Sequence, residues 1–251
     1  MIFPIGYSEH AIASFEIFER LQSTGKIPTD IRFQVSLPTP FATGFNYISP
    51  NGREEFLKVY EKSMATDVQS IVDVIPHDKL AIQWDVCQEV LIFNNYFPGR
   101  SNNYKQEVFD QLARIGDIVP VGVELGYHIC YGSPGDDHIV KPENFSMSVE
   151  FANGIFDNIG RSVEFIHLPG TYGQPSDEFY APLETLKLPK GCELYLGLLF
   201  FNDKGGDAAR IAAARKIMPE FGISTVCGWG RANPDRVPQL LNSHKVAFSV
   251  G

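Results

Sequence analysis

The sequence lacks the features that mark several large classes of protein. Its longest apolar run, Leu194–Phe201, is far shorter than the roughly 18 residues that span a bilayer. Four cysteines in 251 residues do not indicate a disulfide scaffold. With 21 basic against 30 acidic residues, and no cluster of more than two Lys or Arg, no basic patch for nucleic acid or an anionic membrane is evident.

Several short motifs are also missing. No strand is followed by G-x-G-x-x-G, and neither a P-loop nor a G-x-S-x-G turn occurs. Dinucleotide, nucleoside triphosphate and serine-hydrolase chemistry are therefore disfavoured. Met1–Tyr7 carries no basic segment of a secretory signal. We expect a cytoplasmic protein with a small-molecule substrate and no nucleic-acid or membrane partner.

Apolar runs alternate with stretches of helical spacing along the whole chain. This alternation predicts strands at Arg32–Leu37, Leu80–Val86, Val123–Tyr131, Ser162–Leu168, Glu193–Phe200 and Ser224–Gly228. It predicts helices at Ser8–Ser23, Gly52–Val74, Tyr104–Gly116, Pro142–Ile159, Asp207–Phe221 and Pro234–Ser243, the first capped by Ser8 and followed by Gly25.

The loops that enter the strands are short, and those that leave them are longer and richer in functional groups. This asymmetry is typical of a (β/α)8 TIM barrel, whose site lies at the carboxyl ends of its strands. Six strands are evident where eight are needed. Either Ile2–Ile5 and Val246–Val250 supply two irregular ones, or the barrel is incomplete at its N-terminus. No linker divides residues 1–251, so we expect one domain, and the uncovered edges of an incomplete sheet predict a homodimer or larger homo-oligomer.

Two predicted strands end in residues that can bind zinc. His128 and Cys130 lie two positions apart, so they share one face of their strand. Cys227 lies at the end of the last strand and is followed by glycines. Imidazole and thiolate are the usual zinc ligands, although each group taken alone is more often part of a protein core.

A fourth ligand would come from the strand between them. His167 lies near the end of that strand, and Glu164 lies three positions earlier on the opposite face. We prefer His167, with Glu164 or solvent as alternatives.

The second predicted strand ends in a carboxylate, Asp85, which is costly to bury unless it is hydrogen-bonded or binds a ligand. Gln83 shares its face. Aromatic residues near the strand ends, Trp84, Tyr131 and Trp229 among them, indicate either a flat or apolar substrate or simply a core. Gln83, Trp84, Asp85, Tyr131 and Trp229 are the candidate substrate-binding residues.

The order and spacing of three motifs resemble the catalytic barrel of cobalamin-independent methionine synthase, in a superfamily shared with uroporphyrinogen decarboxylase. These motifs are Ala81-Ile82-Gln83-Trp84-Asp85, His128-Ile129-Cys130-Tyr131 and Cys227-Gly228-Trp229-Gly230-Arg231. The agreement covers about Arg32 to Leu241, and the resemblance is that of a divergent relative.

This resemblance implies a zinc-dependent methyltransferase in which His128, Cys130 and Cys227 bind the metal and Asp85 holds the substrate. The Glu that completes the family's site falls at or near His167, so the fourth ligand is changed or displaced. The family's E-P-A after the aspartate is replaced by Val86-Cys87-Gln88, and its D-I-H-S by Phe200-Phe201-Asn202-Asp203. The family's homocysteine-binding strands have no counterpart before Met1, so methionine synthesis itself and folate as methyl donor are not expected.

Three hypotheses follow for the activity. The first is zinc-dependent transfer of a methyl or other alkyl group to or from a small molecule. The second is decarboxylase- or lyase-like chemistry without metal, carried by Asp85, His128 and His167. The third is a small-molecule binder without catalysis, because a fold alone does not fix a function.

Overall fold

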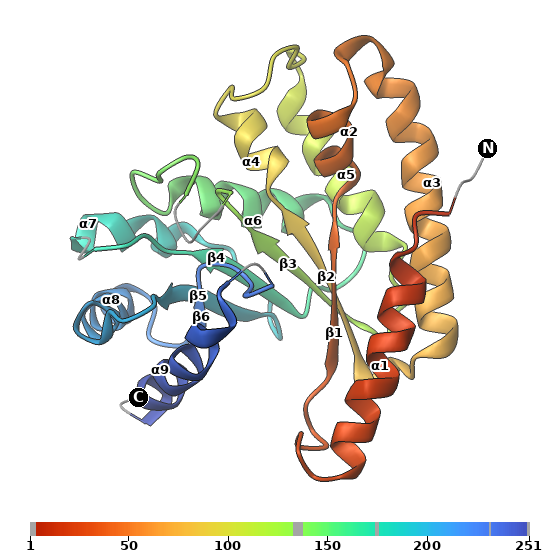
Figure 1. Ribbon diagram of the computed structural model, residues 1–251. Coiled ribbons are helices and arrows are strands. Elements are labelled where there is room, and N and C mark those ends of the chain that lie inside the picture. The colour runs from red at the N-terminus through yellow and green to blue at the C-terminus, as the bar shows by residue number, and fades with distance from the viewer. Residues whose placement is uncertain (1–3, 133–137, 174–175, 231, 250–251) are drawn as a thin grey trace. The chain divides into compact units, whose positions relative to one another are not determined.

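Six strands alternate with helices in a computed structural model that describes residues 4–132, 138–173, 176–230 and 232–249 (Figure 1). The order of the strands in the sheet follows their order in the sequence. The pairs β1–β2, β4–β5 and β5–β6 are parallel. The strands are β1 (Phe33–Pro38), β2 (Leu80–Val86), β3 (Glu124–Ile129), β4 (Phe165–Pro169), β5 (Glu193–Leu199) and β6 (Gly222–Thr225).

Helices fill most of the connections between strands. The α-helices are α1 (Tyr7–Ser23), α2 (Pro40–Tyr47), α3 (Pro50–Val74), α4 (Gln88–Phe93), α5 (Tyr104–Asp117), α6 (Ser146–Asn158), α7 (Asp177–Tyr180), α8 (Lys204–Ile217) and α9 (Val237–Ser249). Short 3-10 turns are η1 (His77–Lys79), η3 (Ala181–Thr185) and η4 (Pro234–Arg236).

The chain divides into two compact units, and one of the divisions falls within β3. The first contains the residues up to Tyr127 together with Asn158–Glu164, and the second contains His128–Asp157 and the residues from Phe165 onward. The first unit therefore holds β1, β2 and the start of β3, and the second holds the end of β3 and the remaining strands.

In the first unit, the long helix α3 buries one stripe of apolar side chains and packs beside α1 (Figure 1). Met64, Val68 and Ile71 follow the spacing of one helical face, and all three are buried. On α1, Phe15 meets Phe33 of β1 edge to face at 5.6 Å between ring centroids. The contact between Phe15 and Phe33 joins α1 to β1, which pairs in parallel with β2, the strand that carries Gln83 and Asp85.

In the second unit, β5 is buried along most of its length, and a fully buried arginine ties its end to the neighbouring segments. Arg210, on α8, donates to the carbonyls of Leu198 and Gly173, each at 2.7 Å. It also pairs with Asp203 at 2.8 Å and with Asp207. A buried guanidinium is stable only with such a set of acceptors. The network holds the carboxyl end of β5 against the loop after β4.

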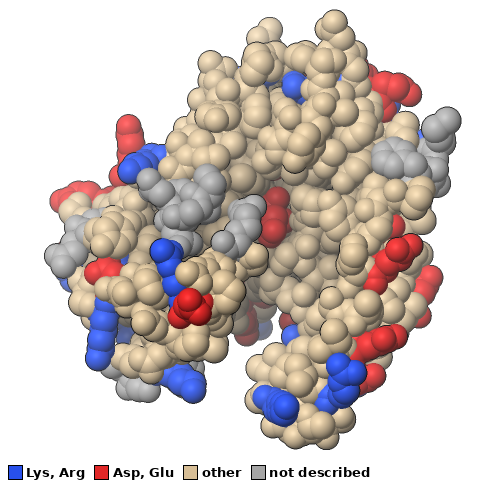
Figure 2. Space-filling view, viewed as in Figure 1, with Lys and Arg blue, Asp and Glu red and all other residues tan. Residues whose placement is uncertain are grey.

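Acidic and basic side chains are interspersed over the visible face of the described residues (Figure 2). Exposed partners form ion pairs, such as Lys58 with Glu54 at 2.8 Å. None of the helices in the described ranges is both long and apolar enough to span a bilayer.

The prediction of six strands in a parallel α/β fold is confirmed, and β2 has the predicted bounds. The last strand ends at Thr225 instead of Gly228. Val246–Val250 was one of the two segments that could have supplied a further strand, but its residues up to Ser249 belong to α9, and Val250 lies outside the described residues. Of the other expected edge strand, Pro4 and Ile5 are irregular and the rest is not described. A complete eight-stranded barrel stays a prediction.

The helix predictions need several corrections, one of which is that the helix expected at Pro234–Ser243 is η4 followed by α9, which continues to Ser249. Ser8 does not cap α1: Gly6 does, and the backbone N–H of Ser8 donates to Asp67 at 3.1 Å. The helix expected from Pro142 begins at Ser146, and the one expected from Asp207 begins at Lys204. The short helices α2 and α4 were not predicted at all.

Candidate metal centre

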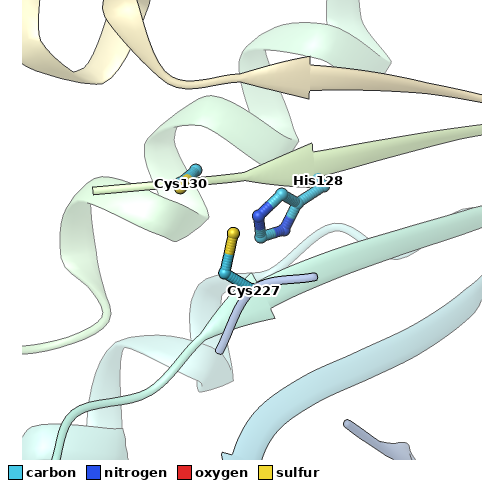
Figure 3. Close-up of side chains that lie close together, drawn as sticks. All are labelled: His128, Cys130 and Cys227. Carbon is cyan, nitrogen blue, oxygen red and sulfur yellow. The ribbon is translucent and has the colours of Figure 1, made fainter. Parts of the chain in front are cut away.

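Three potential ligands converge at the carboxyl ends of two strands in the second unit. The ligand atoms of His128, Cys130 and Cys227 all lie within 4.8 Å of one another. Figure 3 shows the His128 ring and the Cys227 thiol pointing toward each other from their separate segments. His128 and Cys130 are buried, with 4% and 5% of their surfaces exposed. The structure therefore brings together the three residues that the sequence predicted as ligands.

Cys227 lies in the turn that follows β6, and a local hydrogen-bond relay fixes that turn. The Thr225 hydroxyl donates to the Cys227 carbonyl at 2.8 Å and accepts the indole N–H of Trp229 at 2.9 Å. The Trp229 ring also meets His244 of α9 edge to face, at 5.5 Å between centroids. Trp229, predicted to bind substrate, thus has a clear part in holding the Cys227 backbone in place.

His167 contacts His128 directly. It lies on β4, and its Nδ1 is 2.6 Å from the Nδ1 of His128. The Nε2 atom of each ring is buried without a hydrogen-bond partner. The group of three that could hold a metal does not include His167, which was predicted as the fourth ligand.

Burial and neighbouring groups set the protonation of two of these residues. Burial and the nearby His128 ring hold the pKa of His167 well below its usual range, and the backbone of Thr225 opposes this only in part. A hydrogen bond with Cys130, together with burial, raises the pKa of the Cys227 thiol, while His128 acts in the opposite direction. Without a metal, His167 is neutral and Cys227 is a protonated thiol.

The residues present fit a zinc ion. One imidazole and two thiols are zinc ligands of the right kind, and a bound metal stabilises the thiolate form. The unpartnered Nε2 of His128 is a buried polar atom that a metal would satisfy. Structural zinc sites have four protein ligands, whereas catalytic sites have three and an open position. Three such groups converge among the described residues, so they would leave one position of a four-coordinate zinc open.

Glu164, the alternative fourth ligand, is engaged elsewhere in the first unit. One of its carboxylate oxygens accepts the backbone N–H of Leu125 and an N–H of Arg161, each at 2.8 Å. Ser162 donates to the other oxygen. These bonds explain why an acidic residue precedes β4.

Three predicted substrate-binding residues lie on β2 in the first unit. Gln83 donates to Asp85 at 2.8 Å and to Ser36 at 3.3 Å, which confirms that Gln83 and Asp85 share a face. Trp84 points to the other face and is fully buried, with its indole N–H unpartnered. Tyr131, in the second unit, is buried with its hydroxyl 2.9 Å from that of Ser148. The assignment of these residues to substrate binding stays a prediction.

Glu89, a buried acid in the first turn of α4, was not predicted as a functional residue from the sequence. It is fully buried, accepts a hydrogen bond from Thr39, and has one oxygen without a partner. Burial raises its pKa to about 7, although the bond from Thr39 acts in the opposite direction. The available signal was a glutamate followed directly by Val90-Leu91-Ile92.

The geometry defines an α/β protein with parallel strands and a His-Cys-Cys cluster at two strand ends. A crystal structure from Listeria monocytogenes, of a protein provisionally named as a vitamin-B12 independent methionine synthase, has a similar fold, with a TM-score of 0.58 and 17% sequence identity. The similarity covers 87% of this chain, which spans 63% of the length of that structure. No family model matches the sequence. No curated protein matches it significantly either.

Proposed function

We propose that this protein binds zinc through His128, Cys130 and Cys227 and transfers a methyl or other alkyl group to or from a small-molecule thiol. The observation that carries the proposal is the convergence of these three ligand atoms within 4.8 Å. The fold similarity to a protein provisionally named as a methionine synthase supports the same class of reaction. Methionine synthesis itself is not proposed, because the sequence departs from that family at several site positions.

Zinc held there would stabilise the thiolate of a substrate at the open position near neutral pH, which makes the sulfur a nucleophile. The chain's own residues prepare the site for this chemistry. His128 offers a buried nitrogen that no hydrogen bond occupies. Cys130 and Cys227 lose their protons when the metal binds, so binding is favoured by higher pH.

The Thr225–Trp229 relay holds the Cys227 turn, so this ligand is positioned before the metal arrives. Preorganised ligands lower the entropy cost of binding. The resemblance to the methionine synthase family implies a role for Asp85 in substrate binding, and within the first unit Gln83 donates a hydrogen bond to this carboxylate at 2.8 Å.

The experiment that tests the proposal is titration of the cobalt-substituted protein with 2-mercaptoethanol, a minimal thiol. A thiol that enters an open position should increase the thiolate-to-cobalt charge-transfer absorption, and an alcohol of the same size, ethylene glycol, should not. An unchanged spectrum with the thiol would contradict an open position for a sulfur substrate.

A further inference from the structure

The pair of histidines beside the metal centre carries one proton between two facing nitrogens. The Nδ1 atoms of His128 and His167 are 2.6 Å apart, which is a hydrogen-bond distance. A neutral imidazole has one N–H and one lone pair, so one of the rings donates and the other accepts. The ring planes differ by only 17°, and their centroids are 4.6 Å apart. Because the nitrogens are much closer than the centroids, the rings meet edge to edge, as an N–H···N bond requires.

The two thiols decide which ring is the donor. His128 is the member of the pair that also belongs to the cluster with Cys130 and Cys227, and because its Nδ1 faces His167, Nε2 is the nitrogen it has left for a metal. To bind a metal through Nε2, this ring must keep the lone pair there and hold its proton on Nδ1. His128 then donates to His167, and His167 accepts with its own Nδ1.

The two nitrogens of His167 face different neighbours. Its Nδ1 faces His128, and its Nε2 lies against the backbone of β5 and β6. A Cβ at Gly197 would be 3.0 Å from that Nε2, 2.8 Å from the Cα of Val226 and 2.9 Å from the Thr225 carbonyl oxygen. The absence of a side chain at Gly197 therefore makes room for the His167 ring, and His167 lies outside the group of three that could hold a metal.

We infer that His167 is a positioning residue of the metal centre: it accepts the Nδ1 proton of His128 and holds that ring in the tautomer whose Nε2 is free for the metal. The inference rests on the metal site proposed above. It also replaces the expectation that His167 is the fourth ligand. Metal-binding histidines usually donate their second N–H to a carboxylate or a carbonyl, and here an imidazole has that role.

Two nearly isosteric substitutions separate support from ligation. His167→Asn can place its side-chain oxygen near the position of Nδ1 and accept the same proton, whereas His167→Leu has a similar shape and no acceptor. We expect His167→Leu to weaken zinc binding by about 10- to 100-fold, the usual effect of losing such a partner, and His167→Asn to stay within about tenfold of the wild type. Zinc affinity is measured by competition with a chromophoric chelator.

Cobalt spectra provide a readout that a general loss of packing would not mimic. If His167 only positions His128, the ligand-field bands of the cobalt-loaded His167→Asn protein keep the wild-type pattern, because the coordinating atoms are the same. If both variants weaken zinc binding equally and both shift the ligand-field bands, His167 is a ligand and the inference is wrong. Wild-type affinity in His167→Leu would also overturn it.

Nitrogen-15 NMR of histidine-labelled, zinc-loaded wild-type protein tests the tautomers without any substitution. The inference predicts that His128 has its proton on Nδ1 and His167 has its proton on Nε2. The reverse assignment would overturn it, even if a variant failed to fold. A wild-type protein that binds no zinc would instead refute the proposed metal site, and the positioning role with it.

Discussion

Replacing Glu89 by glutamine should remove a stability loss that the wild-type protein suffers as the pH rises. Glu89 is fully buried in the first unit, and burial raises its pKa to about 7. Between about pH 4.5 and pH 7 the folded protein keeps a proton that the unfolded chain has lost. Stability therefore falls with increasing pH across this window, because the folded state binds more protons there.

The size of the effect follows from the two pKa values. The folded value of about 7 lies above the ordinary 4.5, and each pH unit is worth about 1.4 kcal/mol. The carboxyl group should thus cost the folded state about 3 kcal/mol above pH 7 and nothing below about pH 4.5. Glu89→Gln has the same shape and carries no charge, so its advantage over the wild type should grow by about 3 kcal/mol across this range.

Urea unfolding at several pH values measures this difference. Tryptophan fluorescence can follow the first unit, which holds Glu89. The chain has two tryptophans, of which Trp84 is buried in the first unit. In a Trp229→Phe background, its fluorescence follows the unit that holds Glu89. Both proteins are compared in that background, so the effect of the background substitution cancels.

Thr39 provides the matched controls. Its hydroxyl donates to Glu89 and also accepts from the backbone of Ala42 at the start of α2. Thr39→Ser keeps both bonds and should leave the pH profile unchanged. Thr39→Val removes the bond that favours the charged carboxylate, so the stability loss should extend to higher pH. A Glu89→Gln advantage that is constant with pH, or that grows toward acid, would refute the reasoning.

Two further substitutions test the packing that supports the metal centre, each by urea unfolding. Arg210→Met should lower the free energy of unfolding of the second unit by about 3–5 kcal/mol, because Asp207 stays buried without the guanidinium that pairs with it. Lys58→Met, which removes an exposed ion pair, should lower the free energy of unfolding by less than about 1 kcal/mol. A cost at Arg210 as small as that at Lys58 would contradict the buried network. Gly197→Ala should destabilise by about 1–3 kcal/mol, because its new methyl group would lie 2.8–3.0 Å from three neighbouring atoms. A neutral effect would show that the space beside His167 is larger than the structure gives.

The sequence predicted the elements whose signal is local. β2 was found with its full bounds because its apolar run is bounded by polar and proline-containing turns. α2 was missed because its helical signal, Pro40 after the capping residue Thr39, looks like a rigid turn at the start of a helix of only eight residues. The last strand was placed too late, because Cys227 and the glycines after it form a turn that Thr225 and Trp229 stabilise.

For the site, the sequence predicted which residues meet but not how they pair. His128 and Cys130 could be placed on one face because they lie two positions apart on a strand. The bond between His128 and His167 joins two strands and depends on the rotation of both rings, which no local pattern encodes. The burial of Glu89 likewise depends on packing around α4 that the apolar run after it only suggests.

Our proposal that His128, Cys130 and Cys227 hold a zinc ion is tested most directly by the metal content of protein purified without chelator. We predict about one zinc per chain in the wild type and in the control variant Cys192→Ser, which replaces a buried cysteine outside the cluster. The variant Cys227→Ser should lose most of the zinc and keep its fold. Zinc retained in Cys227→Ser, or metal-free wild-type protein that still turns over a substrate, would contradict the account and favour the metal-free mechanism.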